Sequence, residues 1–141
     1  MASPVSTRRA IYTSKSLKSP YLSQAIQVNN LLFVSGNLGW DMNRQGLVPG
    51  GAVPETEQLF KNLSAVLEAA GCSPRNVVKV NVYLKDMSDF AAVNEVYLRY
   101  FNQEPRPART AVQVAKLPRG ARVEMEATAV VGKIHDVTSR L

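Results

Sequence analysis

The segment from residue 107 to 131 constrains the fold most, because it encodes two strands and the turn between them. Residues 110–115 are short, apolar and β-branched, and residues 117–120, Leu-Pro-Arg-Gly, have the composition of a turn. Residues 122–131 then alternate between apolar and polar side chains with a period of two. The alternation predicts a strand with one buried face and one polar face, and it puts Glu124 on the polar face.

A local excess of positive charge overlaps this segment. Between Glu104 and Glu124 the chain has no acidic residue, and we expect the region to attract an anion. Its basic residues are Arg106, Arg109, Lys116, Arg119 and Arg122. Arg109 opens one predicted strand and Glu124 lies in the middle of the other, so the sequence predicts an arginine and a carboxylate on neighbouring strands.

The hydrophobic pattern of the whole chain predicts six strands and two amphipathic helices. In chain order these are a strand at 9–12, a hairpin of 24–28 and 31–35 around Asn29-Asn30, a helix at 54–70, a strand at 77–84, a helix capped by Ser88 or Asp89 and ending near 101, and the strands at 110–115 and 122–131. This β-β-β-α-β-α-β-β order predicts an α+β fold, with a mainly antiparallel six-stranded sheet and both helices on one face.

The second face of that sheet has no predicted cover. Residues 31–34 are apolar on both sides of their strand, and no further element remains to pack there. An uncovered apolar sheet face is typical of contacts between subunits, so the sequence predicts a homo-oligomer.

Two local patterns give more specific expectations. Val78, Val80, Val82 and Leu84 are expected to share the buried face of their strand. The glycines of residues 35–39, Ser-Gly-Asn-Leu-Gly, permit a close backbone approach or a positive φ, although a plain β-bulge or loop explains them as well.

Composition places the chain among globular proteins. Its 141 residues, 45% hydrophobic and 20% charged, predict one domain over 1–141, with an ordered core at about 9–132 and short flexible ends. No apolar run or apolar leader suggests a membrane partner. The single cysteine, Cys72, cannot form an internal disulfide and fits a reducing compartment. His135 is the one histidine, and no His/Cys cluster has metal-ligand spacing, so no zinc or iron site is predicted.

The net charge of +6 leaves two interpretations open. One is affinity for nucleic acid or a membrane surface, and the other is a set of small sites for anionic substrates. No run of five or six basic residues forms a basic arm, which limits the first interpretation to weak RNA binding.

The two ends of the chain bear on localisation. The acid-free N-terminal region has a transit-peptide composition, but residues 9–12 also fit a first strand, which we prefer. The terminal Ser139-Arg140-Leu141 resembles a peroxisomal Ser-Lys-Leu address, although a chance polar tail explains it as well. We expect a cytoplasmic protein and leave a peroxisomal or mitochondrial pool open.

Several short motifs together resemble the RidA/YjgF family of reactive-intermediate deaminases. That family is marked by a Pro-Ala-Arg-Ser/Thr segment and by a later strand with the pattern Ile/Val-Glu-Ile/Met-Glu-Ala. Here the two motifs correspond to residues 107–110 and 123–127, with the turn at 117–120 between them. Further matching pieces, in the family's order, are Pro20-Tyr21, Ser35-Gly36, Ala69-Ala70-Gly71, Val77-Val78-Lys79, Asp89-Phe90 and Val93-Asn94-Glu95-Val96-Tyr97. The resemblance covers roughly residues 9–132.

The resemblance implies a chorismate-mutase-like α+β fold and a homotrimer with active sites in the clefts between subunits. It implies hydrolysis of enamine and imine intermediates, such as 2-aminoacrylate and 2-iminopropionate, to a 2-oxo acid and ammonia. Such intermediates are released by pyridoxal-phosphate-dependent enzymes. The resemblance implies no cofactor for the hydrolysis itself.

The resemblance also implies roles for particular residues. The carboxylate-binding arginine of the family falls on Arg109, the acidic residue near the imine on Glu124, and the aromatic lid residue on Tyr21. The other substrate-binding positions fall on Ser35, Gly36, Asn94 and Thr110. The chain departs from the family pattern at Ser19, where glycine is usual, and at Ala111, where many members have cysteine.

The chemistry explains why this reaction would use these side chains. A guanidinium fixes a carboxylate with a planar two-pronged donor, which lysine does not offer. Hydrolysis then needs a proton at the substrate nitrogen, and at C3 for an enamine, and one carboxyl group can move these protons. Without the resemblance, Arg109 fits a surface ion-pair residue better than a substrate-binding one, and Glu124 fits a solvated strand residue better than a catalytic one. Glu126, on the same face, is assigned a structural or pairing role.

Two other functions stay open at this point. Members of the family in animals have been described as ribonucleases or translation inhibitors, although one histidine and no acidic cluster argue against an acid-base or metal-dependent nuclease. A trimer that binds ligands or holds unfolded chains without catalysis is the other alternative.

Overall fold

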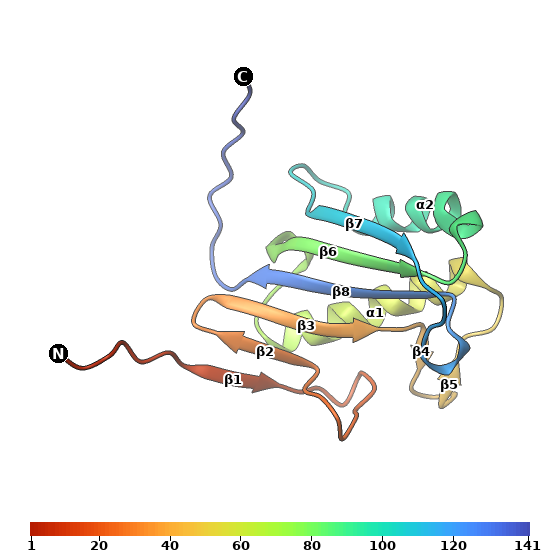
Figure 1. The fold of residues 1–141 in the computed structure, drawn as a ribbon, viewed down its shortest axis with the longest axis horizontal. Coiled ribbons are helices and arrows are strands. Elements are labelled where there is room, and N and C mark those ends of the chain that lie inside the picture. The colour runs from red at the N-terminus through yellow and green to blue at the C-terminus, as the bar shows by residue number, and fades with distance from the viewer.

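The computed structural model describes residues 1–141 and contains a six-stranded sheet backed by two helices (Figure 1). The strands of the sheet are β1 (Arg8–Ile11), β2 (Ala25–Val28), β3 (Leu31–Asn37), β6 (Val77–Leu84), β7 (Ala108–Gln113) and β8 (Val123–Val130). The helices are α1 (Ala52–Ala69) and α2 (Phe90–Tyr100). A small separate hairpin consists of β4 (Trp40–Asp41) and β5 (Gly46–Leu47). The predicted α+β class and the predicted order of the main elements are confirmed.

The sheet is mixed, with the strand order β1-β2-β3-β8-β6-β7. Four pairings are antiparallel, and β6 and β7 are parallel because α2 carries the chain back between them. The prediction that β7 and β8 are neighbours is wrong, since β6 lies between them. Alternate residues of β8 are buried along its whole length, whereas β7 is largely exposed. The more apolar strand therefore takes the centre of the sheet and β7 takes an edge.

One hydrophobic core lies between the sheet and the helices, and we call this side of the sheet the helix face. Leu59, Leu63 and Leu67 of α1 pack there against alternate residues of β3, β6 and β8. Helix α1 ends as predicted, because Gly71 follows it with a φ of 73° that suits the C′ position. The opposite side, the open face, has no helix over it (Figure 1).

The turn between β2 and β3 has the predicted form, and the face assignment of β6 needs one correction. Asn29 has a φ of 52°, and Val28 pairs with Leu31 across the two-residue turn. In β6 the register shifts between Val77 and Lys79. The predicted inward position of Val78 is therefore wrong, because this bulge buries Val77 and leaves Val78 exposed.

The start of α2 also differs from the prediction that Ser88 or Asp89 caps it. Asp86 accepts a hydrogen bond from the backbone N–H of Ser88 at 2.8 Å and so caps a short 3-10 turn ahead of the helix. Asp89 makes no cap and pairs with Arg122, 2.8 Å from its Nη2. The ion pair ties the start of α2 to the chain just before β8.

The open face carries exposed apolar side chains, as the sequence predicts. Leu31 and Phe33 of β3 and Val112 of β7 are each about two-fifths exposed or more, at 39%, 46% and 42%. An exposed apolar surface of this kind on a sheet face fits contact with another protein surface.

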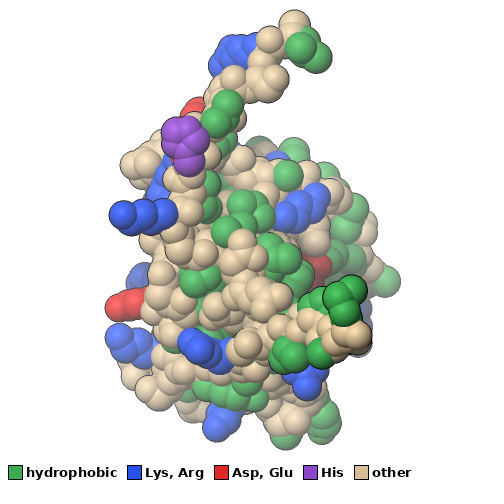
Figure 2. Space-filling view, turned by 90° about the vertical axis from the view of Figure 1, so that its left-hand side faces the viewer, with side chains coloured by type: hydrophobic (Ala, Val, Ile, Leu, Met, Phe, Trp, Pro, Cys, Tyr) green, Lys and Arg blue, Asp and Glu red, His purple; other side chains and the backbone are tan.

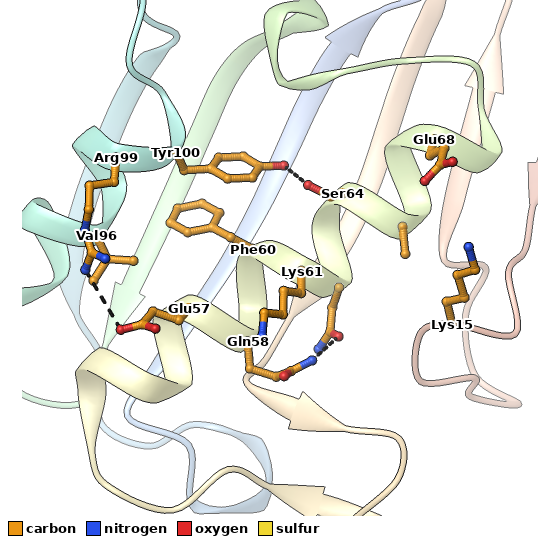
Figure 3. A pocket seen from close by; sticks show the side chains of 12 residues that line it. Lys15, Glu57, Gln58, Phe60, Lys61, Ser64, Glu68, Val96, Arg99 and Tyr100 are labelled. Atoms are coloured by element: carbon orange, nitrogen blue, oxygen red, sulfur yellow. Dashed lines mark hydrogen bonds and ion pairs between the residues drawn. The ribbon is translucent and has the colours of Figure 1, made fainter.

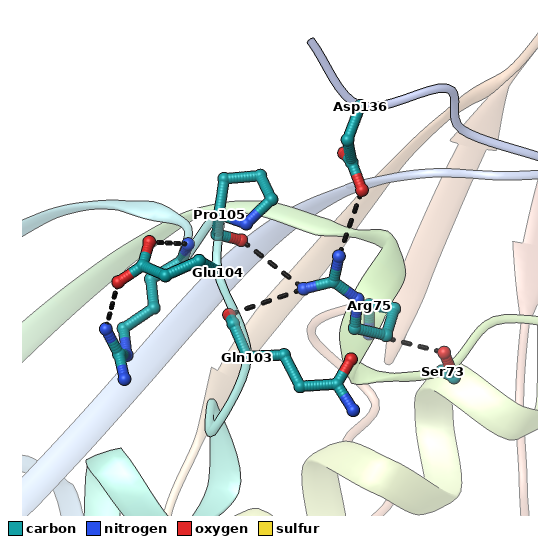
Figure 4. A network of polar contacts seen from close by, with 7 residues as sticks. Ser73, Arg75, Gln103, Glu104, Pro105 and Asp136 are labelled. Carbon is teal, nitrogen blue, oxygen red and sulfur yellow. Dashed lines mark hydrogen bonds and ion pairs between the residues drawn. The ribbon is translucent and has the colours of Figure 1, made fainter. Parts of the chain in front are cut away.

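Arg75 attaches the C-terminal segment to the body of the protein (Figure 4). Its guanidinium donates to the backbone carbonyls of Gln103 and Pro105 and pairs with Asp136 at 3.0 Å. Beyond this anchor the chain is exposed to its end at Leu141. Neither helix is long and apolar enough to cross a bilayer, and no three His, Cys, Asp or Glu side chains are grouped as metal ligands would be.

Candidate active site

Arg109 lies on the helix face, in a group of side chains from α2, β7 and the segment between them that we call the arginine cluster: Phe90, Asn94, Tyr97, Arg106 and Arg109. Arg109 donates from Nη1 to Oδ1 of Asn94 at 2.7 Å. Its guanidinium carbon lies 4.7 Å from the centre of the Tyr97 ring and 5.5 Å from that of Phe90. A cavity of about 330 Å³ opens beside Arg109, so the fixed guanidinium remains accessible.

Glu124 lies in a second group, the glutamate cluster: Ser35, Gly36, Trp40, Arg119 and Glu124. They line a cavity of about 210 Å³ at the end of β3. The Glu124 carboxylate occupies the space that a side chain at residue 36 would fill, since a Cβ there would lie 2.0 Å from its Oε1. Gly36 does not have a positive φ, so the close approach applies and the positive φ does not. The β-bulge interpretation is also confirmed, because the register of β3 with β8 shifts between Val34 and Asn37.

The proton affinity of Glu124 is increased by its surroundings. Burial raises the pKa of its carboxyl above the usual value, and the negative charge of Glu126 raises it further. Glu126 itself accepts hydrogen bonds from Asn81 at 2.9 Å and from the Tyr83 hydroxyl at 2.5 Å, in agreement with the pairing role predicted for it. The bond to Glu126 raises the pKa of Tyr83 to about 12. A carboxyl group with a raised pKa can carry a proton at a higher pH than an ordinary glutamate.

The chain contains only two buried side-chain polar atoms without a hydrogen-bond partner, and there is one in each cluster. They are Nε1 of Trp40, a residue of the glutamate cavity, and the hydroxyl of Tyr97, a residue of the arginine cavity, and both atoms are themselves buried. Unpartnered buried polar groups are rare in folded proteins and are often found at functional sites.

The two clusters do not meet within one chain. Arg109 pairs with Val80 in the sheet, and Val80 is buried on the helix face. Glu124 pairs with Tyr83 and lies on the open face with Glu126. The two side chains therefore leave opposite faces, and their backbones are about 10 Å apart along the strands and about 10 Å apart across β6.

The other predicted site residues divide between these places. Asn94 joins Arg109, whereas Ser35 and Gly36 join Glu124. The Ser35 hydroxyl donates to the Ser23 carbonyl at 2.6 Å, which ties the last part of β3 to the chain just before β2. Tyr21 is 93% exposed and reaches neither cluster. Thr110 is on the open face, where it accepts a hydrogen bond from Lys79 at 3.2 Å, so it does not lie beside Arg109.

The basic segment predicted to attract an anion is only partly free to do so. Arg106 forms an ion pair with Glu104, and Arg122 pairs with Asp89. The remaining basic side chains form none of the four ion pairs of the chain; they are Arg109, Lys116 and Arg119.

The chain is similar to proteins of a known family. The family model described as Endoribonuclease L-PSP, that of the RidA/YjgF proteins, matches residues 13–131. A mouse protein named 2-iminobutanoate/2-iminopropanoate deaminase is 53% identical over 127 residues, which are 89% of this chain and 93% of the mouse protein. The chain belongs to the RidA/YjgF family.

Solved structures of RidA/YjgF proteins have the same fold. RidA from an Antarctic Psychrobacter is 44% identical, with a TM-score of 0.83, over 87% of this chain and 99% of that one. TdcF from E. coli, solved with bound serine, is 30% identical, with a TM-score of 0.80, over 88% of this chain and 99% of that one.

Two buried amide side chains of this RidA/YjgF protein shape the glutamate cavity and were missed by the sequence analysis. Gln24 donates to the carbonyls of Ser16 and Leu17 and holds the loop that forms one wall. Asn62 of α1 donates to the carbonyls of Leu38 and Trp40, at 2.9 and 2.8 Å, and holds the opposite wall. A polar residue within the apolar stripe of α1 was the available signal for Asn62.

The largest cavity of this RidA/YjgF protein lies elsewhere, along the outer side of the helices (Figure 3). It measures about 580 Å³ and contains none of the predicted site residues. Phe60 and Tyr100 are stacked at its base, Tyr100 shares a hydrogen bond with Ser64, and Glu57 pairs with Arg99 at 3.9 Å. Lys15, Lys61 and Glu68 also line this groove and form none of the ion pairs of the chain, but none of the predicted site residues lies among them.

Proposed function

We propose that this protein hydrolyses small 2-imino acids, and their enamine tautomers, to 2-oxo acids and ammonia. The observation that carries the proposal is a carboxyl group with a raised pKa, that of Glu124, seated in a cavity against Gly36. The mouse relative bears the name of such a deaminase, and the TdcF relative holds a small amino acid.

Arg109 would hold the substrate. Every 2-imino acid has a carboxylate, and a guanidinium that keeps one face in contact with Tyr97 and one nitrogen on Asn94 has its other donors free for that carboxylate. Fixing a substrate of three or four carbons at one end orients its C=N bond, and orientation is a large part of the possible rate gain.

Glu124 would move the protons. Water adds to C2 of the imine while the π electrons of the C=N bond pass to nitrogen, which takes a proton from Glu124. The carboxylate then accepts a proton from the added water, and the resulting carbinolamine expels ammonia to leave the 2-oxo acid. For an enamine, the same group first protonates C3. Positioned acid-base groups of this kind contribute about 10²–10⁴-fold, and the reaction requires no cofactor.

A complete site would draw on two copies of the chain, in a homotrimer. Arg109 and Glu124 leave opposite faces of the sheet, so Arg109 of one copy would face Glu124 of the next. A ring of three such contacts is closed and leaves no unpaired half. The exposed apolar residues of the open face, Leu31, Phe33 and Val112, supply a surface for the contact.

The remaining predicted residues have supporting roles in this arrangement. Tyr21, nearly fully exposed in the single chain, would cover the substrate once the neighbouring copy is in place. Ser35 and Gly36 shape the space around the Glu124 carboxyl, and Asn94 fixes the Arg109 guanidinium. Thr110, bonded to Lys79 on the open face, would act at the contact between copies.

The test is to let a pyridoxal-phosphate-dependent serine or threonine dehydratase release its unstable intermediate and to follow the decay of that intermediate. The protein should accelerate the decay above the rate in buffer, and Glu124→Gln should remove most of the acceleration. Decay at the buffer rate in the presence of the folded wild-type protein would rule the deaminase out.

RNA cleavage is a second candidate because the matching family model is described as an endoribonuclease and the chain has a net charge of +6. On the face seen in Figure 2, however, Lys and Arg side chains are dispersed rather than gathered into one patch. Association with RNA through such charges should weaken steeply between low and physiological salt. Cleavage that persists at physiological salt and is lost in Glu124→Gln would favour this alternative.

A further inference from the structure

The wall of the glutamate cavity carries a second guanidinium, that of Arg119. Its Cζ atom lies 4.4 Å from the centre of the Trp40 ring, and both residues line the same cavity as Glu124. Arg119 is held in a short 3-10 turn with a φ of 60°, a left-handed backbone conformation that is uncommon for a residue other than glycine. The stack against the indole limits the movement of a side chain that would otherwise be free in solvent.

The charge of Arg119 is not used within the chain. The side chain belongs to none of the four ion pairs and makes no hydrogen bond, so all its donors are free. Glu124 does not pair with it, although both line one small cavity, so there is space between carboxyl and guanidinium. Nε1 of Trp40 also has no acceptor, but this atom is buried, so it adds no donor to the cavity.

Glu124 and the unpaired guanidinium of Arg119 line the same cavity of about 210 Å³. This arrangement suits a substrate with a negative charge at some distance from the reacting carbon. In the proposed function the carboxylate beside the C=N bond is taken by Arg109 of the neighbouring copy. Arg119 is then left for another acidic group, further along the substrate.

We propose that Arg119, stacked on Trp40, binds the side-chain carboxylate of 2-imino dicarboxylic acids, so that the protein hydrolyses these in preference to alkyl 2-imino acids of equal length. This specificity rests on the proposed deaminase function. It assigns Arg119 to substrate selection and leaves the proton transfers to Glu124.

The activity test compares two five-carbon substrates, 2-iminoglutarate and 2-iminopentanoate, each generated in place by an amino-acid oxidase in the presence of catalase. In the wild-type protein kcat/KM should be higher for the dicarboxylic imine. Arg119→Gln should lower the ratio of the two kcat/KM values by about ten- to a hundredfold, since a hydrogen-bonded charge is lost. Arg119→Lys, which keeps the charge without the fork, should lower the ratio less.

Lys116→Gln is the matched control. Lys116 is exposed in the same basic segment, and it does not line the cavity. This variant removes one positive charge at nearly the same place in the chain and should leave the ratio unchanged. If the ratio of the two kcat/KM values falls equally in Lys116→Gln, the net charge of the protein alone explains the preference for the dicarboxylic imine. The assignment to Arg119 would then be wrong.

A binding measurement separates this proposal from the proposed function. Trp40 is the only tryptophan, so its fluorescence reports directly on the Arg119 stack. Titration of the wild-type protein with 2-oxoglutarate should change the emission at about ten- to a hundredfold lower concentration than 2-oxopentanoate, and Arg119→Gln should remove the difference. If neither imine is hydrolysed but this preference is found, the deaminase fails and the Arg119 site stands. Equal binding of the two oxo acids overturns the Arg119 site, whatever the activity.

Discussion

The arginine cluster and the glutamate cluster are built in opposite ways. Arg109 extends from an edge strand onto a helix, where Asn94 and two aromatic rings fix a guanidinium that already has partners. Glu124 extends from the central strand into a space created by the absence of a side chain at Gly36, and its surroundings make the charged form less favourable. The first cluster is prepared to hold a charge, whereas the second is prepared to exchange a proton.

Each cluster supplies only one of the two requirements of catalysis, binding or proton exchange. Binding without proton exchange gives only affinity, and a proton donor without an oriented substrate gives little rate. The two unpartnered buried polar atoms follow the same division, because one belongs to each cluster.

Mixing two inactive variants tests most directly whether one active site takes its two clusters from different copies. Arg109→Ala and Glu124→Gln should each lower kcat/KM by about a hundredfold or more. After refolding the two together in equal amounts, about one quarter of the sites in randomly mixed rings should combine an intact Arg109 with an intact Glu124. The mixture should therefore recover about that fraction of wild-type activity. Mixed oligomers, verified by mass, that show no recovery would place both side chains of a site in one copy.

The next largest effect should come from filling the space under Glu124. A Cβ in Gly36→Ala would displace the Glu124 carboxyl, and a displacement of about 1 Å can lower kcat by up to about a hundredfold. The fold should survive, because the backbone of residue 36 is not left-handed and the displaced group is the end of a side chain. Gly46→Ala is the control, since nothing lies near its Cβ position. Steady-state kinetics and circular dichroism check both variants.

A smaller effect, a shift in the pH dependence of kcat/KM, should show that Glu124 exchanges a proton. Glu126→Gln removes the negative charge that helps to raise the pKa of Glu124, so that pKa should fall. The protonated fraction of Glu124 is then lost at a lower pH, and the alkaline limb of the kcat/KM profile should move to lower pH. Glu68→Gln removes the same charge from an exposed site on α1 and should leave the profile in place. An unchanged profile in both variants would mean that the limb belongs to another group.

The smallest effect concerns stability. The pKa of Glu124 is higher in the folded chain than in the unfolded chain, so its contribution to stability is fully present below the ordinary glutamate pKa and is lost as pH rises through the raised pKa. Glu124→Gln removes this loss and should raise the melting temperature at pH 7 relative to the wild-type protein. At a pH below the ordinary glutamate pKa the difference should disappear. Thermal unfolding at the two pH values gives the answer, and a lower melting temperature at pH 7 would contradict it.

Much of the local structure was predictable because short-range chemistry determines it. Asn29-Asn30 specified its hairpin and Gly71 its helix end, since both depend on a positive φ within a few residues. The alternation around Glu124 gave the correct faces of β8 because the period of a strand is two. In β6 the same alternation gave the wrong face for Val78, because the bulge there adds one residue to the strand. One extra residue puts the side chains on its two sides out of phase.

The arrangement of the site was not predictable from these patterns. Whether β7 pairs with β8 or with β6 depends on the crossover through α2, and that pairing decides how far Arg109 lies from Glu124. The resemblance placed Thr110 among the substrate-binding positions with Arg109, yet neighbouring residues of a strand lie on opposite faces. The family resemblance supplied the site residues but could not say which of them one chain brings together.

The place of β8 has a further consequence for how the molecule is made. This strand is the last of the sheet to leave the ribosome, and it joins the sheet half with β1, β2 and β3 to the half with β6 and β7. At a synthesis rate of about 5–20 residues per second, both halves wait with open edges until residues 123–130 have emerged. A prematurely terminated chain lacks both the joining strand β8 and the Glu124 carboxyl that this strand carries. Unfinished copies therefore cannot complete the sheet.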